Sequence, residues 1–137
     1  EAATAVESVA DLMAAGDFTA ARKSLREMQP SFARSNPQIA ATLSMQAGDL
    51  GIRMNDWQAA ETDLDAAVEL FRTAGNQEQE AASDLLRIYA LGRHWDADHS
   101  QPTQIRSALE VTYRTALEHH IVEYADAATV ANCCDAD

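Results

Sequence analysis

Two six-residue stretches, GDFTAA at residues 16–21 and NDWQAA at residues 55–60, decide the fold. Each places a turn residue, an aspartate, an aromatic residue, two spacers and an alanine in that order. The two aromatic residues, Phe18 and Trp57, lie 39 positions apart (57 − 18 = 39), and a leucine follows each final alanine by four residues. A weaker third copy, RHWDA, begins at residue 93. A fixed spacing of this length predicts an array of repeated helical units.

The residues around these stretches divide the chain into helices. The aspartates at the start of each copy, Asn36 and Asn76 are the residue types that cap helix N-termini, and Pro37 suits a first helical turn. Glycine and proline end helices, so Pro30 is expected to stop the second helix, a linker to follow over 31–36, and Gly92 to close the fifth. The expected helices are 2–15, 18–28, 37–54, 57–74, 77–91 and 102–132, with an irregular stretch over 94–101.

Composition supports an all-α chain and excludes several classes of protein. About a fifth of the 137 residues are alanine, and five glycines and three prolines are available to interrupt helices. No apolar run reaches the roughly 20 residues needed to cross a bilayer, so no membrane partner is expected. With 22 acidic against 10 basic side chains the net charge is −12, which opposes binding to nucleic acid. Glu1 begins neither a signal peptide nor a reading frame, and we expect a fragment or processed chain.

These features resemble the tetratricopeptide repeat family, in which each unit is a pair of antiparallel helices. The middle copy is the most similar, with Gly48 at the small position of its first helix and Trp57, Ala60 and Leu64 downstream. Gly51 departs from the family, which has a bulky aromatic residue there. The spacing resembles the longer variant of about 40 residues found in helical arms of bacterial regulators. The resemblance covers residues 1 to 98 and weakens in the third copy.

The resemblance implies a right-handed superhelix (an α-solenoid) of about three helix pairs in a single domain, 1–137. The repeats would cover 2–36, 37–75 and 76–101. Small residues such as Ala21 and Ala60 would allow the paired helices to approach closely. The long helical segment 102–132 would cap the last repeat. The N-terminal end has no such cap, which makes it a candidate homodimer contact.

The family places its binding groove on the concave face, which the first helix of each pair lines. In this register the groove residues would be Met13, Thr42, Met45, Asp49, Ile52, Arg53, Glu80, Ser83 and Arg87. Their mixture of apolar and charged side chains suits a peptide or protein segment. The negative charge would favour a basic partner, or it serves solubility alone. Alternatively, these residues pack against a neighbouring domain of the same polypeptide.

Three groups of residues carry side chains that could bind a metal or react. His94, Asp96, Asp98 and His99 are metal-ligand types, but their spacing matches no ligand motif, and a solvated loop is the expectation. His119 and His120 are adjacent on a helix and cannot share one face. The vicinal pair Cys133 and Cys134 is expected to stay reduced, since it cannot form an unstrained disulfide. We expect no metal, no cofactor and no catalysis.

The leading functional hypothesis is therefore a cytoplasmic scaffold for protein–protein interaction. An alternative is a sensory or regulatory arm of a larger bacterial signalling protein, such as a transcription regulator or a nucleotide cyclase, that binds a small ligand or peptide. A metal-dependent enzyme that uses the residues around His94 is a remote third alternative.

Overall fold

The computed structural model describes residues 2–99, 107–108 and 110–111, with side chains from Glu7 to Trp95 and at the four later positions. Within these residues the chain is all-helical, as expected, with no strand. The five helices are α1 (Ala2–Ala14), α2 (Phe18–Phe32), α3 (Pro37–Arg53), α4 (Trp57–Ala74) and α5 (Gln77–His99). The expected boundaries of the third and fourth helices are thus correct to within one residue.

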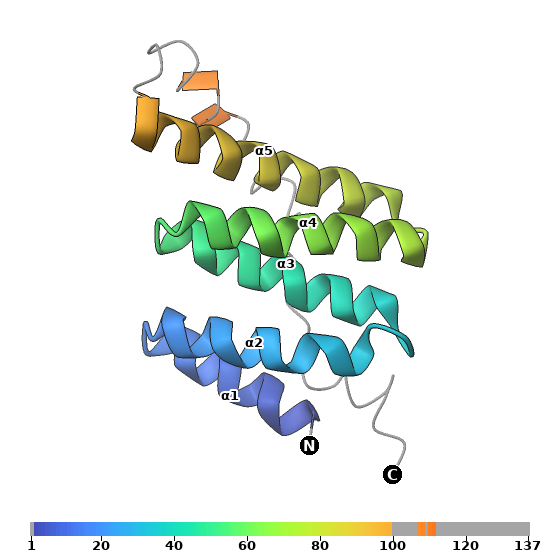
Figure 1. Ribbon diagram of the computed structural model, residues 1–137. Coiled ribbons are helices and arrows are strands. Elements are labelled where there is room, and N and C mark those ends of the chain that lie inside the picture. The colour runs from blue at the N-terminus through green and yellow to red at the C-terminus, as the bar shows by residue number, and fades with distance from the viewer. Residues whose placement is uncertain (1, 100–106, 109, 112–137) are drawn as a thin grey trace.

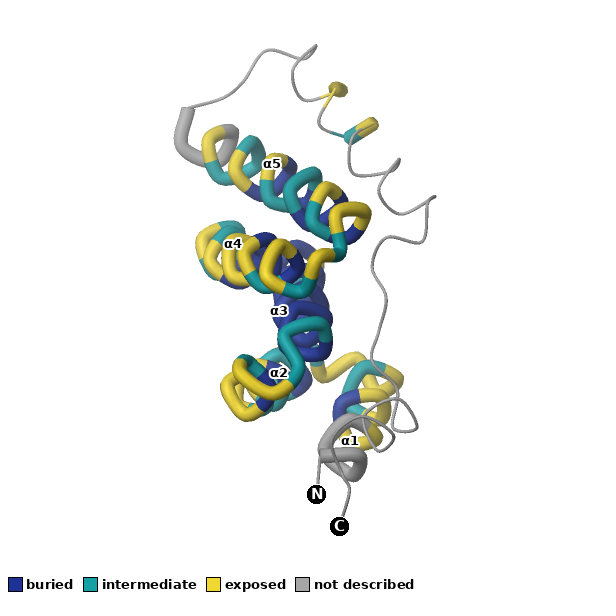
Figure 2. The backbone as a smooth tube through the Cα atoms, turned by 90° about the vertical axis from the view of Figure 1, so that its right-hand side faces the viewer, coloured by how far each residue is buried: buried dark blue, intermediate teal, exposed yellow. Residues whose placement is uncertain are grey.

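The helices stack in chain order, and each runs antiparallel to the next (Figure 1). Each contacts its neighbour in the chain, and α3 also touches α5. A view turned by 90° shows α2 and α4 on one side of α3 and α1 on the other (Figure 2). This arrangement places α3 at the centre of the described part of the chain.

The two six-residue stretches form the same turn. Gly16 and Asn55 both have positive φ, 79° and 58°, the left-handed conformation that ends a helix most readily at glycine or asparagine. The next residue then caps the following helix: Asp17 Oδ1 accepts from Ala20 N at 3.2 Å, and Asp56 Oδ1 accepts from Ala59 N at 3.3 Å. The repeat seen in the sequence is therefore a repeat of backbone geometry.

A second type of turn joins one helix pair to the next, and it also repeats. Asn36 Oδ1 accepts from Ile39 N, and Asn76 Oδ1 accepts from Gln79 N, both at 3.1 Å. Asn76 also donates from Nδ2 to Oε1 of Gln38 at 3.2 Å. Since 76 − 36 = 40, α5 follows α3 with an offset of 40 residues.

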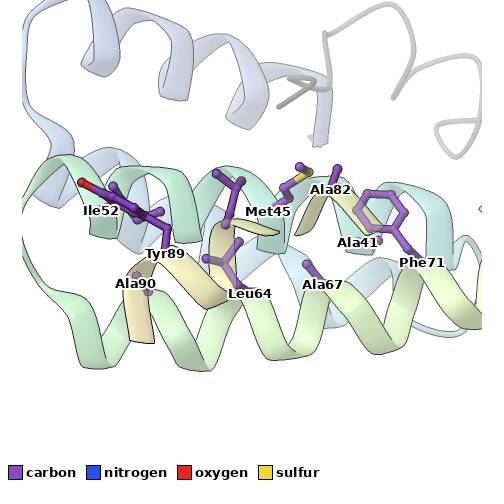
Figure 3. Packing of buried hydrophobic residues seen from close by; sticks show 11 residues of the cluster. Ala41, Met45, Ile52, Leu64, Ala67, Phe71, Ala82, Tyr89 and Ala90 are labelled. Carbon is purple, nitrogen blue, oxygen red and sulfur yellow. The ribbon is translucent and has the colours of Figure 1, made fainter. Parts of the chain in front are cut away.

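The core consists of two clusters that meet at α3. One joins α1, α2 and α3 through residues such as Leu25, Leu43 and Leu50. The other joins α3, α4 and α5 through Met45, Leu64, Phe71, Leu86 and others (Figure 3).

Close contact between α3 and α4 depends on glycine. A Cβ at Gly48 would lie 2.5 Å from Cγ of Leu64, and one at Gly51 would lie 3.0 Å from Cβ of Ala60. Small residues thus let α4 approach, as the sequence predicts for Gly48 and Ala60.

The helix end predicted at Pro30 is wrong. Helix α2 continues to Phe32, so most of the expected linker 31–36 is helical or a tight turn. Pro30 is exposed, whereas Phe32 is buried in the cluster with α1 and α3. Burial of a phenylalanine stabilises by roughly 1.5–3 kcal/mol, which is comparable to the cost of proline in a helix.

The break predicted at Gly92 is also wrong, because α5 continues without interruption to His99. The expected irregular stretch 94–101 is helical as far as it is described, and the third copy around Trp95 forms no turn. One glycine costs a helix interior only about 1 kcal/mol, and contacts on both sides of Gly92 offset that cost. Arg93 forms an ion pair with Glu110, and His94 Nδ1 lies 2.7 Å from Glu61 Oε2.

Several predictions fall outside the described residues. They concern the pairs His119–His120 and Cys133–Cys134 and most of the capping segment 102–132. The described residues of that segment, which are Ser107, Ala108, Glu110 and Val111, are helical. In the described part of the chain, no helix combines the length and apolar character needed to span a bilayer.

Candidate functional site

The predicted groove residues of α3 are buried. Met45 and Asp49 have no exposed surface, and Thr42 and Ile52 are buried as well. Met45 and Ile52 pack in the cluster with α4 and α5. The interpretation of these four residues as contact surface is therefore wrong for this structure. Arg53 remains exposed and donates from Nε to Oδ2 of Asp49 at 2.9 Å.

In the first unit, Met13 is half-buried and packs against the cluster of α1, α2 and α3. It stabilises the first helix pair and offers a partner little surface. Arg53 is therefore the most accessible of the groove residues that the sequence predicts in the first two units.

The three predicted groove residues of α5 face α4, and Ser83 is fully buried. The offset of 40 explains this, because Glu80, Ser83 and Arg87 correspond to Ala40, Leu43 and Ala47 of α3. Those α3 residues face the preceding helix pair, where Ala40, Leu43 and Ala47 pack with Ala21 and Leu25 of α2. Their α5 counterparts consequently face the preceding helix, α4. The sequence register chosen for the third unit placed them on the wrong side.

Glu80 and Arg87 nevertheless line a cleft, which we call the α4–α5 cleft. It consists of two hollows of about 560 and 310 Å³ that share Arg87. Helix α4 contributes Gln58, Glu61, Thr62, Asp65, Val68 and Arg72, and α5 contributes Gln77, Glu80, Ala81, Asp84, Arg87 and His94. From Gln77 to His94 the cleft extends about 25 Å at 1.5 Å per residue.

Polar contacts join the two walls of the α4–α5 cleft. Arg72 of α4 contacts Glu80 of α5 at 3.0 Å, and His94 Nδ1 lies 2.7 Å from Glu61 Oε2. Arg87 contacts Asp84 at 2.6 Å on its own helix and Asp65 across the cleft at 3.9 Å. His94 is therefore partly buried against α4 and is not part of the solvated loop that the sequence predicts.

A smaller cleft of about 190 Å³ lies between α2 and α4. Its buried acid is Asp63, which is 8% exposed and contacts Arg26 Nε through Oδ1 at 3.3 Å. Oδ2 has no hydrogen-bond partner among the described residues. Burial raises the pKa of Asp63, although the charges of Arg26 and Arg22 oppose the shift.

Helix α5 also exposes large apolar side chains on one side. Ile88, Leu91 and Trp95 are 40%, 48% and 53% exposed. Their spacing of three and four residues places them on one stripe of the helix with Ala81. We call this stripe the end face. The sequence did not predict the stripe as a site, although the groove register of the third unit continues from Arg87 to Leu91. The signal was the spacing itself, which became visible once α5 was known to continue past Gly92.

The opposite side of α5 carries a compact polar cluster. Arg93 stacks over Trp57 at 5.0 Å and donates to Tyr89 Oη at 3.0 Å and to Glu110 Oε1 at 2.8 Å. Tyr89 Oη also donates to Glu110 at 3.2 Å. Burial raises the pKa of Tyr89, and the Arg93 charge opposes that shift. These contacts fix the position of residue 110 beside Tyr89 and Arg93.

Across the described residues, no three His, Cys, Asp or Glu side chains are placed to hold a metal ion. The charged groups of the α4–α5 cleft are paired with one another. No family model, curated protein or solved structure matches the chain.

Proposed function

We propose that this protein is a scaffold of the tetratricopeptide type, an α-solenoid that binds a protein segment and performs no chemistry of its own. The binding surface is the α4–α5 cleft, which includes Glu80 and Arg87 of the site expected from the sequence. The buried face of α3 is not part of it.

The repeated turns support the repeat assignment. The pairs Gly16–Asp17 and Asn55–Asp56 have the same conformation and the same cap, and both are followed by a fully buried alanine at position 21 or 60. Stacked helix pairs of this kind form extended surfaces along the array rather than enclosed pockets.

The shape and lining of the α4–α5 cleft carry the proposal. Sites for small molecules are concave, and apolar residues predominate in their lining. This cleft is instead elongated, and it presents Arg72, Glu80, Asp84 and Arg87 along an apolar floor of Val68 and Ala81. Alternating charges beside an apolar strip fit a chain segment that lies along the cleft.

The test is a selection of displayed peptides on the intact chain, followed by titration calorimetry. Groove contacts with a short peptide typically give micromolar affinity, about −8 kcal/mol. We expect the double variant Glu80→Lys, Arg87→Glu to weaken the selected peptides about tenfold, a loss of about 1.4 kcal/mol. This variant keeps the net charge, so a general change of electrostatic attraction cannot explain a loss.

Arg53→Glu provides a control on α3, since Arg53 is exposed and lies outside the cleft. It should leave the affinity nearly unchanged. Loss of affinity in Arg53→Glu but not in the cleft variant would place the site on α3 and contradict the proposal.

A further inference from the structure

The end face of α5 lies where the preceding unit has a packed helix. With the offset of 40 that Asn36 and Asn76 establish, Ile88 corresponds to Gly48 and Leu91 to Gly51. Helix α4 packs against those two glycines through Leu64 and Ala60. The side of α3 that receives a helix is therefore the side of α5 that exposes Ile88 and Leu91.

Among the described residues that follow α5, Glu110 contacts another side of this helix. Glu110 contacts Tyr89 and Arg93. Successive residues are about 100° apart around a helix. Tyr89 and Arg93 are therefore separated by more than about 90° from each large residue of the end face, Ile88, Leu91 and Trp95. The contact of Glu110 therefore does not cover the end face, where Ile88 and Leu91 are 40% and 48% exposed.

Charge distinguishes the candidate occupants. The α4–α5 cleft beside the end face is lined by four acids, Glu61, Asp65, Glu80 and Asp84, against two arginines, so its net charge is −2 (2 − 4 = −2) with His94 neutral. The whole chain carries −12. A second copy would bring the same negative surface and would be repelled, whereas a cationic segment would be attracted.

Length and register define the shape of the occupant. From Ala81 to Trp95 the end face extends about 21 Å, or about four helical turns. Ile88 and Leu91 replace glycines, so a docked helix must stand further away than α4 does from α3, or present small residues to them. A helix of about 15 residues with an apolar stripe satisfies both conditions.

We infer that the end face of α5, with the adjoining α4–α5 cleft, docks a basic amphipathic helix of a partner protein. This helix takes the place of the second helix in the third pair, with its apolar stripe on Ile88 and Leu91 and its lysines or arginines beside the acids of the cleft. The inference rests on the proposed function and adds the conformation and charge of the partner segment.

The probe is a designed 15-residue helical peptide with a leucine and alanine stripe and lysine flanks. Three further peptides are compared: a twin with glutamate flanks, a scrambled form without the stripe, and a form with a central proline that cannot be helical. Binding to the full chain is measured by fluorescence anisotropy at low and high salt. We expect the basic helix alone to bind well, with affinity that falls as salt rises.

The decisive variant is Ile88→Asp, Leu91→Asp. Both side chains are already exposed, so the fold should tolerate the change, which circular dichroism can verify. The variant makes the chain more negative and would strengthen non-specific attraction of a basic peptide. Docking predicts the opposite, a loss of about tenfold or more because apolar contact is removed. The control Thr19→Asp, Ser31→Asp adds the same charge at two exposed positions of α2 and should not weaken binding.

Each other result overturns the inference. Unchanged or tighter binding to Ile88→Asp, Leu91→Asp would show non-specific attraction. Equal binding of the proline form would show that the occupant is not helical, and equal binding of the acidic twin would remove the charge argument. If the wild-type chain sediments as a dimer and the variant Ile88→Asp, Leu91→Asp as a monomer, the occupant is a second copy. Peptides selected on the α4–α5 cleft would still support the proposed function in each case.

Discussion

Substitution of Gly48 by alanine tests whether the close approach of α4 to α3 requires a residue without a side chain. The added Cβ would lie 2.5 Å from Cγ and 2.6 Å from Cδ2 of Leu64. Carbon atoms in contact prefer about 3.5–4.0 Å, so one of the two helices must move by about 1 Å. Leu64 is fully buried, and protein interiors are close-packed.

The expected magnitude follows from two opposing effects. Overpacking of a dense core costs typically 1–3 kcal/mol, and this overlap lies toward the upper limit because it involves Cγ rather than a flexible chain end. Alanine in place of glycine in a helix contributes about 1 kcal/mol in the other direction. The net loss for Gly48→Ala should therefore be about 2 kcal/mol.

A double-mutant cycle with Leu64→Ala isolates the contact. Leu64→Ala alone should cost about 2–5 kcal/mol because it leaves a cavity. In that background the three atoms nearest to the new Cβ at position 48, which are Cγ, Cδ1 and Cδ2 of Leu64, are absent, so Gly48→Ala should be neutral or stabilising by about 1 kcal/mol. The coupling between the two sites should be about 2–3 kcal/mol.

Urea denaturation followed by circular dichroism measures the four free energies of unfolding. The Leu64→Ala background serves as the control for helix propensity, since propensity acts equally in both backgrounds. The reasoning about the α3–α4 contact is refuted if Gly48→Ala lowers the free energy of unfolding equally in the wild type and in the Leu64→Ala background.

Three further outcomes are expected. Ala60→Leu should cost about 1–3 kcal/mol by overpacking, whereas exposed Gln58→Leu should cost little, and equal losses in denaturant melts would count against the repeat register. The raised pKa of Asp63 means that the folded state holds the proton more tightly than the unfolded state, so wild-type stability should fall, relative to Asp63→Asn, as the pH rises above about 4, where the unfolded side chain loses its proton; a constant difference would show no such shift. A chelator should leave the melting temperature unchanged, and a decrease would reveal a bound metal.

The turns could be predicted because their signals are local. An aspartate after a left-handed residue satisfies the free N–H groups of the next helix within three residues, so GDFTAA and NDWQAA specify their conformation without help from the rest of the chain. The asparagine caps at positions 36 and 76 work in the same way. The bounds of α3 and α4 follow from these caps.

The helix ends at Pro30 and Gly92 could not be predicted, because distant contacts decide them. Pro30 by itself predicts the end of the helix, but Phe32 is buried against α1 and α3 only if the helix continues. Beyond Gly92, Arg93 and His94 find Glu110 and Glu61, which are 17 and 33 residues away in the sequence. Propensity is a weak guide where such tertiary contacts exist.

The candidate site was predicted only in part for a related reason. A family register identifies which residues share a helix face, but the burial of that face depends on the neighbours on both sides. Helix α3 has neighbours on both sides, so Met45 and Asp49 are buried. Helix α5 has α4 on one side, so Ile88 and Leu91 stay exposed. The difference between two equivalent helices becomes visible only in the assembled structure.

The most direct test of the account is to map a bound peptide onto the chain. The backbone amides of the isotopically labelled protein would be monitored by NMR while a peptide selected by display is added. The account predicts that the largest shifts cluster between Gln58 and Trp95, at the residues of α4 and α5 that line the cleft and the end face. Shifts confined to α1 and α2, with α5 unaffected, would contradict the claim that the α4–α5 cleft is the binding surface.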